Sequence, residues 1–514
     1  MRQRTSRWLT LGVAVLAIAA FAAVSVSGAG ANGAARTAKP SGKITIVIPS
    51  EPRALNSDID NTSIAIERLV VDNLVHTSPT TYQPLRTGLI TNWKQVDPLT
   101  WDFTVRKGVR FTNGEKFDAA AAAWDVAHSL TSIKGATAAY VAVIASASAR
   151  NATTLRIKTK SRVPYLPNVL ENIQALPPKY FQQVGDTGFG RTPVGTGPFV
   201  LKSWSPGQNI VFAPNPKYYG TKAQIGSIML TWASEATTRT NLLKTGAVDI
   251  ATALPVTEQA GGDYDVQRVL GTFIIALEFN MHQAPFSDVR LRRAVAKAIN
   301  RRLLVSAVFA KGLGATPYQN VFNPQFTSEG KHGDKYITYD PDGARALLKQ
   351  IGNVPAIDFY WPIGQYLSDD QVGQAITGML QDVGFRVNQH PMEKAAYFDL
   401  LLADKMPGMH LLGGSITLGI EQGNLNSKYL SNSVITYCAN GSIDQLAARA
   451  ATMPAGKKRD AAYNKIEEIL ISDNVCPVPL YIGKDVYGVS KRVKGFKAYS
   501  SGSWASLGQV SVGK

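Results

Sequence analysis

A glycine phrase at residues 193–198 has residue types that could bind phosphate. It reads Pro-Val-Gly-Thr-Gly-Pro, and closely spaced glycines that open a helix can cradle the phosphates of a nucleotide. The dinucleotide pattern G-x-G-x-x-G requires a third glycine at position 200, where this sequence has Val200. Pro198 has no N–H to donate, and a strand pattern follows it instead of a helix. The phrase therefore predicts a turn that supports the fold, not a nucleotide site.

Other enzyme signatures are incomplete as well. The patterns GxxxxGK[ST] and HExxH are absent, and the run Gly-Gly-Ser-Ile-Thr at 413–417 fails the G-x-S-x-G elbow at its last position. The carboxylate pairs at 369–370 and 467–468 lie on helical patterns, where solvated faces are typical. A Ser-His-Asp triad assembled from distant segments remains an open alternative. We predict that the protein is not an enzyme and needs no cofactor.

The two cysteines, Cys438 and Cys476, predict a disulfide. The six histidines are scattered, and none lies at ligand spacing from either cysteine, so we predict no metal site. In an oxidising compartment the two thiols could pair, and closing that loop would add roughly 4 kcal/mol of stability in the chain-entropy model. Two buried free thiols are the alternative.

The first 35 residues predict export. Three arginines precede an apolar run at 9–26, and small residues follow it, which is the pattern of a signal peptide. An uncleaved membrane anchor is the alternative, because an apolar run of this length can just span a bilayer. No cysteine ends the run, so the sequence excludes a lipid anchor attached through cysteine. We expect the mature protein in the periplasm or cell envelope.

The chain carries a formal net charge of +17, of which three charges belong to the arginines of the predicted signal peptide. Lysine and arginine are spread along the rest, with only short clusters at 290–293 and 491–494. This distribution predicts a solvated basic surface suited to an anionic cell envelope, and no nucleic-acid partner. An envelope protein that binds polyanions is a further alternative.

The periodicities predict an inserted α/β lobe within a β-rich region. Strand and helix patterns alternate at 356–362, 368–382 and 385–391, which is typical of an α/β unit. Strand patterns precede this lobe, and strands return after 478. Other expected elements are strands at 43–49, 101–111 and 273–280, a hairpin at 199–214, and helices at 63–75, 237–245, 288–309 and 457–470. This order predicts that the chain crosses twice between two lobes, as a hinged protein with a cleft requires.

Several phrases in this order resemble the family 5 extracellular solute-binding proteins, the peptide/nickel type that serves ABC importers. The resemblance runs from about Ile44 to about Val493. The segments that carry it are TGLITNWKQVDPLTWDFTVRKGVRFTNGEKFD, PVGTGPF, NPKYYG, GAVDI and FNMHQAPFSDVRLRRAVAKAINRRLL. Each phrase is common alone, but their order and spacing together are typical of this family.

The resemblance implies an α/β, two-lobed periplasmic-binding-protein-like fold (type II, cluster C) with an extra β-rich subdomain in lobe one. The implied divisions are a signal peptide at 1–35, lobe one at 36–77, 189–279 and 481–514, the extra subdomain at 78–188, and lobe two at 280–480. The resemblance further implies a monomer that closes on a small-molecule solute and then docks on ABC permease subunits in the membrane. A peptide is the default solute. The alternatives are an opine, a sugar or a chelated metal, and an exported hydrolase is a different class of function.

Candidate ligand residues follow from the strand pattern and from the family resemblance. Trp361 ends a strand of the inserted lobe, where ligands usually bind, so we predict that it contacts the solute, with core packing as the alternative. Peptide-binding relatives carry a Gly-Trp phrase followed by an aspartate that holds the α-amine, and the stretch 410–424 has neither; its first acid is Glu421. Hydrogen bonds to a neutral or anionic solute are expected there, unless the glycines only bend the strand. The predicted ligand-binding residues are Glu51, Asn280, Trp361, Gly414, Ser415 and Thr417.

Overall fold

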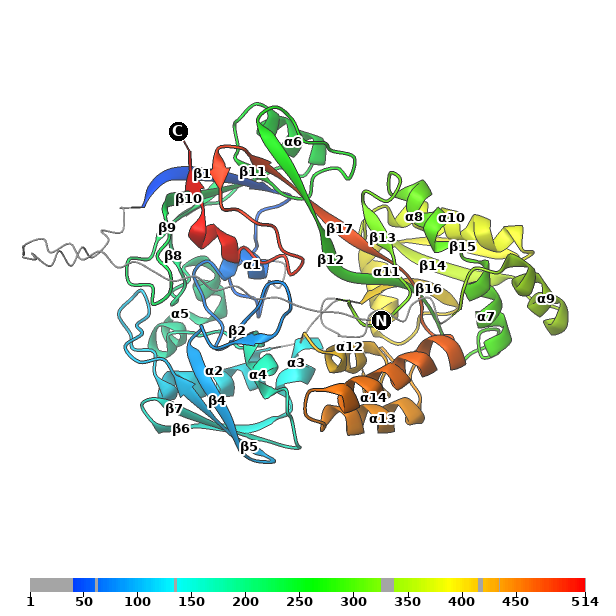
Figure 1. The fold of residues 1–514 in the computed structure, drawn as a ribbon, viewed down its shortest axis with the longest axis horizontal. Coiled ribbons are helices and arrows are strands. Elements are labelled where there is room, and N and C mark those ends of the chain that lie inside the picture. Colours follow the sequence, from blue (N-terminus) through cyan, green and yellow to red (C-terminus); the bar gives the residue numbers. More distant parts are fainter. Residues whose placement is uncertain are drawn as a thin grey trace, which may run out of the picture. The chain divides into compact units, whose positions relative to one another are not determined.

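One mixed sheet of eleven strands runs through the protein (Figure 1). The structure is a computed structural model that describes residues 40–60, 63–133, 136–324, 337–414, 419–433 and 435–513, so the predicted signal peptide lies outside the described residues. The strand order is β15-β14-β16-β12-β17-β11-β1-β10-β9-β8, and β13 pairs with β17 outside this path. The strands are β1 (Ser41–Ile48), β8 (Phe199–Ser205), β9 (Asn209–Pro214), β10 (Ile225–Trp232), β11 (Ile250–Ala251), β12 (Tyr264–Phe279), β13 (Ala315–Pro317), β14 (Ile357–Ile363), β15 (Val387–Glu393), β16 (Met409–Gly414) and β17 (Val478–Ser490).

The long antiparallel pair β12 and β17 connects the two parts of this sheet. The first half of β12 pairs with the end of β17, which also pairs with β11, and the second half of β12 pairs with β16. The predicted strand at 273–280 is thus the second half of a longer strand. The register between β12 and β17 is irregular between Leu270 and Ile274, where three residues of β12 face one residue of β17. Such a bulge bends the strand and leaves backbone out of the ladder.

The first apolar core lies under β1 and β10, which pair in parallel. The glycine phrase at 195–197 packs against this core, because the N–H of Gly197 donates to the carbonyl of Val70 at 2.9 Å and the N–H of Phe199 donates to that of Leu69 at 2.8 Å. A Cβ at Gly197 would lie 2.7 Å from the Val70 carbonyl oxygen, so only glycine permits this approach. The phrase is a structural turn, as predicted. The same contacts explain why α1 (Ile64–Glu67) is shorter than the predicted helix at 63–75.

A separate four-stranded sheet with the order β4-β5-β7-β6 has its own apolar core. Its strands alternate buried and exposed residues, as Trp101, Phe103 and Val105 show on β5. Asp118 begins α2, because its carboxylate accepts hydrogen bonds from the N–H groups of Ala120 and Ala121. The elements around this sheet and the first core are β2 (His76–Thr77), β3 (Pro84–Leu85), β4 (Ile90–Asp97), β5 (Thr100–Val105), α2 (Ala119–Ser132), α3 (Ala136–Val141), β6 (Ile144–Asn151), β7 (Thr154–Thr159), α4 (Leu166–Val169), α5 (Pro178–Arg191) and α6 (Ala236–Lys244).

The largest apolar core lies around β14, β16 and the second half of β12. The predicted helix at 288–309 is two helices, because the side chain of Asn300 accepts a hydrogen bond from the N–H of Leu303 and begins a second helix. The helices of this part are α7 (Val289–Ala298), α8 (Arg301–Val308), α9 (Pro341–Ile351), α10 (Asp369–Asp382), α11 (Lys394–Leu402), α12 (Glu421–Lys428), α13 (Gly441–Ala451) and α14 (Lys457–Glu468). The short strands β18 (Val493–Lys494) and β19 (Ser511–Val512) close the chain beside β1.

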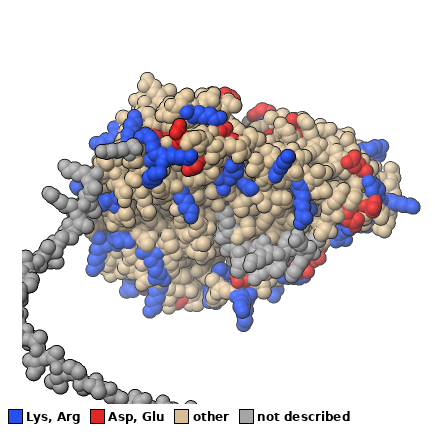
Figure 2. Space-filling view, turned by 45° about the horizontal axis from the view of Figure 1, so that its top comes forward, with Lys and Arg blue, Asp and Glu red and all other residues tan. Residues whose placement is uncertain are grey.

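The charges on the surface are dispersed. Lysine and arginine side chains are scattered over the face shown in Figure 2, with fewer acidic side chains between them. Within the described residues, no helix is long and apolar enough to cross a membrane.

Candidate functional site

A pocket of about 260 Å³ opens at the irregular register between β12 and β17. The bulged residues of β12 form one wall, β17 forms the second, and the turn after β14 forms the third. The lining residues are Gly271, Thr272, Phe273, Ile275, Gln365, Tyr366, Leu367, Tyr481, Gly483, Lys484 and Asp485. The pocket thus lies on the two strands that connect the halves of the sheet, at the carboxyl end of β14, where open α/β sheets commonly hold ligands.

The third wall is held in shape by one buried carboxylate. Asp369 is 4 % exposed, and its oxygens accept hydrogen bonds from the N–H groups of Gly364, Gln365 and Tyr366 at 3.2, 2.7 and 2.9 Å. The hydroxyl of Tyr366 accepts a hydrogen bond from the N–H of Gly413 at 2.8 Å. These bonds fix the aromatic ring of Tyr366 at the pocket and tie the end of β14 to the end of β16.

Apolar side chains remain exposed on the pocket wall. Phe273 and Leu367 are each 43 % exposed, although both are large apolar residues. The ring of Phe273 lies 6.3 Å from the ring of Tyr366, measured between centroids. A small group of exposed apolar and aromatic side chains that lines a concave site is typical of a ligand-binding surface.

Asp485 supplies a carboxylate to the pocket. Tyr481, Gly483 and Asp485 alternate along β17, so they share one face of the strand, and all three line the pocket. Asp485 is an exposed residue, but the protein atoms around its carboxylate exclude enough water to raise its pKa from 3.8 to about 6. A shift of this direction at a concave site often marks a functional carboxylate.

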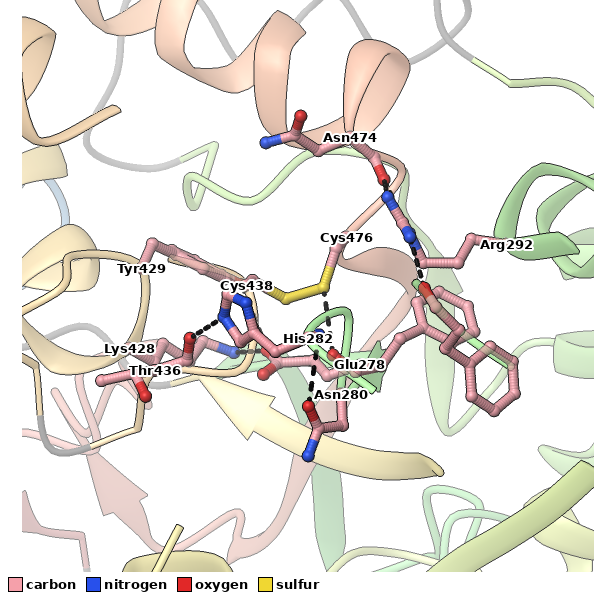
Figure 3. Close-up of a disulfide and its surroundings, with 12 residues drawn as sticks. Glu278, Asn280, His282, Arg292, Lys428, Tyr429, Thr436, Cys438, Asn474 and Cys476 are labelled. Carbon is pink, nitrogen blue, oxygen red and sulfur yellow. Dashed lines mark hydrogen bonds and ion pairs between the residues drawn. A yellow bond between two sulfur atoms is a disulfide. The ribbon is translucent and has the colours of Figure 1, made fainter. Parts of the chain in front are cut away.

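A buried charged pair lies beside the end of β16. The ammonium of Lys428 lies 2.6 Å from Oε1 of Glu278, and the two side chains are 6 % and 0 % exposed (Figure 3). A Cβ at Gly414 would lie 2.9 Å from the Lys428 ammonium, so glycine leaves room for this lysine. His410 faces Glu278 across the β12–β16 ladder and is fully buried, and its burial together with the charge of Lys428 lowers its pKa from 6.5 to about 3.

The parts of the chain that flank the pocket touch each other at two further places. A Cβ at Gly419 would lie 2.7 Å from the Cβ of Tyr82, and the hydroxyl of Tyr140 donates to the carbonyl of Gly423 at 3.3 Å. Tyr82 and Tyr140 belong to the part of the chain with the four-stranded sheet, and Gly419 and Gly423 follow β16.

Two of the predicted ligand residues are structural. The indole of Trp361 is 1 % exposed and packs in the largest core, and its N–H donates to Asp370 at 3.2 Å. Trp361 therefore has the packing role, which corrects the prediction of solute contact. Asn280 is also buried, and its side-chain amide donates to the carbonyl of Met406 at 3.3 Å, so it braces the end of β12.

The other predicted residues lie beside the pocket or away from it. The carboxylate of Glu51 accepts from the indole N–H of Trp204 at 2.7 Å and from the N–H of Gly207 at 3.0 Å, so it braces the β8–β9 hairpin and does not line the pocket. Gly414 lies at the end of β16, next to Gly413, which bonds Tyr366. Ser415 and Thr417 lie outside the described residues. Glu421, the first acid after this stretch, begins α12 and is buried.

The predicted disulfide is present. Cys438 and Cys476 are bonded, both are fully buried, and their Cα atoms lie 5.5 Å apart (Figure 3). The sulfur of Cys476 lies 3.5 Å from the carbonyl oxygen of Phe279, the last residue of β12. Arg292 on α7 donates to the carbonyl of Asn474 at 2.8 Å. The disulfide therefore ties the start of β17 to the segment after α12, close to the end of β12.

One group of side chains has metal-ligating types in proximity. Ligand atoms of Asp58, His128 and Asp186 lie within 4.8 Å of one another, and they come from three separate segments of the first half of the chain. The ring nitrogen Nε2 of His128 lies 3.9 Å from a carboxylate oxygen of Asp58, a distance that an ion pair also explains. Because these residues are far apart in sequence, no local spacing could predict the group.

Sequence reasoning missed Asp485 and Tyr366. Asp485 lies in the strand segment VPLYIGKDVYGV, where two adjacent charged residues interrupt an otherwise apolar run. A charge within such a strand requires a partner, solvent or a ligand. That interruption was the signal that could have indicated the site.

A family model described as "Bacterial extracellular solute-binding proteins, family 5 Middle" matches residues 85–433. The nickel-binding periplasmic protein of Escherichia coli (strain K12) is 29 % identical over 279 residues, which are 50 % of this chain and 51 % of that protein. This chain therefore matches about half the length of that relative. The glutathione-binding protein GsiB of Salmonella choleraesuis (strain SC-B67) is 26 % identical over 425 residues, which are 78 % of this chain and 81 % of GsiB.

The fold has a solved counterpart. The crystal structure of the ABC transporter substrate-binding protein CtaP from Listeria monocytogenes superposes with a TM-score of 0.82 at 18 % sequence identity. The superposition covers 93 % of this chain and 100 % of that chain. At this identity the likeness concerns the fold alone.

Proposed function

The chain belongs to the bacterial extracellular solute-binding proteins of family 5, and from this premise we propose that it captures a small organic solute in the pocket between β12, β17 and the turn after β14, and delivers it to ABC permease subunits. The two-lobed α/β fold predicted from the sequence is confirmed by the likeness to solved binding proteins. The position of the pocket carries the proposal, because it lies on the strands that connect the halves of the sheet.

Capture works by a shift between conformations. A solute that contacts both connecting strands and the turn at 365–367 stabilises the arrangement in which these walls are close together. Its differential affinity for the two arrangements sets how far the equilibrium moves. The contacts of Tyr82 with Gly419 and of Tyr140 with Gly423 belong to the closed arrangement. The permease then distinguishes the closed form from the open one.

The lining favours an organic solute over a bare metal ion or a hydrolase substrate. Among the described lining residues, Asp485 is the one metal-ligating side chain, and no histidine, cysteine or serine is present. A glutathione-binding relative supports a peptide or a peptide-like solute, and a nickel-binding relative supports a chelated metal as the second candidate. An opine or a sugar would also meet apolar and hydrogen-bonding groups here.

We retain the predicted divisions of the chain as part of the proposal. Three separate apolar cores support these divisions. The divisions are lobe one at 36–77, 189–279 and 481–514, the extra subdomain at 78–188, and lobe two at 280–480. Periplasmic relatives support export of the protein. We propose that it acts as a monomer without enzymatic activity.

Native mass spectrometry of gently purified protein tests this function. A bound small molecule should appear as a mass excess that disappears on denaturation. The variant Gly483→Phe should lose this mass, because a side chain at position 483 extends into open space within the pocket and no atom lies within 4 Å of its Cβ. The control Gly378→Phe, at an equally open position on α10 outside the pocket, should retain it. If wild-type protein captures no solute even from a low-mass extract, or if Gly483→Phe captures it as well as the control, the proposal is wrong.

A further inference from the structure

We propose that the pocket holds a positively charged organic group, an ammonium or a guanidinium, against the carboxylate of Asp485. This inference rests on the proposed function and adds the chemical class of the solute. It differs from the expectation of a neutral or anionic solute, which the Gly-Ser-Thr character of the stretch 413–417 suggested. Four observations support it.

The first observation is the direction of the carboxylate. Asp485 shares its strand face with Tyr481 and Gly483, which both line the pocket. A Cβ at Gly271, on the opposite wall, would lie 3.8 Å from Oδ1 of Asp485. The carboxylate therefore lies between the β17 wall and the bulged wall of β12, and a solute in the pocket meets it directly.

The second observation is that no cation among the described residues pairs with this carboxylate. Within the described ranges, Asp485 forms no ion pair and accepts no hydrogen bond. The neighbouring Lys484 also lines the pocket, but its ammonium donates to the carbonyl of Gly312 at 3.0 Å and forms no ion pair with Asp485. The charge of Asp485 acts on the phenols of Tyr82 and Tyr487, whose pKa values are raised mainly by burial and, to a lesser extent, by this charge. Both phenols are neutral at physiological pH and cannot replace a cation.

The third observation is the aromatic wall. Phe273 and Tyr366 line the other walls of the same pocket, and Phe273 is 43 % exposed. The faces of aromatic rings attract ammonium and guanidinium groups, and this attraction grows where water is excluded. A carboxylate together with two aromatic rings thus favours an organic cation that has an apolar body.

The fourth observation excludes the other charge types. An anionic solute would place like charges together at Asp485, where partial exclusion of water strengthens their repulsion. A neutral solute that covered the pocket would remove water from the carboxylate without giving it a partner, which is unfavourable. A cation is the one charge type for which covering the pocket strengthens the interaction with Asp485.

The test uses the full-length mature protein and yeast extract as a mixed source of small solutes. Wild-type protein, Asp485→Asn and the matched control Asp265→Asn, an exposed aspartate of β12 outside the pocket, are each incubated with untreated extract and with extract treated with acetic anhydride. Acetylation removes the charge of amines and leaves guanidinium groups charged. Native mass spectrometry identifies the captured molecules and their amounts.

We expect wild-type protein and Asp265→Asn to capture mainly molecules with an ammonium or a guanidinium group. Asp485→Asn should capture at least tenfold less of these molecules. Acetylation should abolish capture if the group is an amine and leave it unchanged if the group is a guanidinium. Asp485→Asn should unfold at the same temperature as wild type or higher, because it removes a carboxylate that burial disfavours. A loss of capture then reports recognition and not misfolding.

Two results would overturn the inference. If the captured molecules lack a positive charge, or if Asp485→Asn captures as much as the control, the pocket does not select a cation, while the proposed function stands. If wild-type protein captures nothing from either extract, the proposed function fails and this inference fails with it.

Discussion

The ammonium of Lys428 lies 2.6 Å from the carboxylate of Glu278 in a region where both side chains are almost completely buried. Glu278 is on β12 and Lys428 ends α12, so the pair joins a connecting strand of the sheet to the segment that follows β16. The hydroxyl of Tyr429 also donates to Glu278, at 3.3 Å. This pair is a buried structural charge cluster, and the loss of one of its charges should lower stability strongly.

The first prediction concerns that pair. Lys428→Met should lower the free energy of unfolding by roughly 3–5 kcal/mol, because it leaves the buried Glu278 carboxylate without a cation. The double variant Glu278→Leu/Lys428→Met should recover most of this loss, since apolar residues replace both charges. Urea unfolding of the three proteins measures the difference. A double variant as unstable as the single variant would contradict this explanation.

The second prediction concerns the disulfide. Replacing both cysteines, as in Cys438→Ala/Cys476→Ala, should lower stability by about 4 kcal/mol, because the bond closes a loop between residues 38 positions apart. Wild-type protein unfolded in the presence of a reductant should approach the stability of the variant. Urea unfolding with and without reductant checks both statements. A variant with the unfolding midpoint of oxidised wild type would show that the bond does not stabilise the fold.

The third prediction concerns pH. Burial lowers the pKa of His410 to about 3 from its ordinary value of 6.5, so the unfolded chain binds a proton below pH 6.5 that the folded protein does not bind. The contribution of His410 to stability is therefore complete above pH 6.5 and falls by about 1.4 kcal/mol per pH unit below it, down to about pH 3. His410→Leu should remove this part of the pH dependence. If the free energies of unfolding of wild type and variant change in parallel between pH 6.5 and pH 4, this role of His410 is wrong.

The fourth prediction concerns the turn after β14. Asp369→Ala removes the acceptor of three backbone N–H groups, so the ring of Tyr366 should lose its fixed position and the captured amount of solute should fall at least tenfold. Asp370→Ala is the control, because Asp370 bonds Trp361 and Gln374 and not the turn. Native mass spectrometry after incubation with yeast extract measures capture. Equal losses in both variants would indicate general destabilisation of α10 instead.

The fifth prediction concerns solute capture at low pH. The pKa of Asp485 is raised to about 6 by burial, so its charge is present above that pH and is lost below it. Capture of a cationic solute should therefore weaken about tenfold per pH unit once the pH falls below 6. Asp485→Asn should show a flat profile over the same range. Native mass spectrometry from buffers between pH 5 and pH 8 measures both profiles.

Much of the fold could be predicted because its elements carry local signals. Helix α10 follows the predicted range 368–382 within one residue, and the glycine phrase is the structural turn that Val200 and Pro198 indicated. The split between α7 and α8 was missed, because the helical spacing of apolar residues continues through 288–309. The cap at Asn300 begins a new helix without changing that spacing. The helix predicted at 63–75 was too long, because its second half bonds to the glycine turn, a contact distant in sequence.

The site was harder to predict than the fold. The position of Trp361 at the end of a strand favoured it as a ligand residue. This position does not show whether a side chain faces the core or the pocket, and the ring of Trp361 faces the core. Asp485 and Tyr366 line one pocket because β12 has a bulge and because Asp369 holds a turn. Neither feature has a recognisable sequence motif. The disulfide was predictable, since the chain has just two cysteines and an export signal pattern.

Hydrogen–deuterium exchange, with and without the low-mass fraction of yeast extract, shows directly whether the solute binds in this pocket. In wild-type protein, we expect addition of solute to slow exchange in the segments that line the pocket, 271–275, 365–367 and 481–485. Slower exchange is also expected near Tyr82 and at 419–423, where the parts of the chain meet. The variant Gly483→Phe should show no such change. Unchanged exchange at all three lining segments in wild-type protein, under conditions where native mass spectrometry detects bound solute, would show that the solute binds elsewhere.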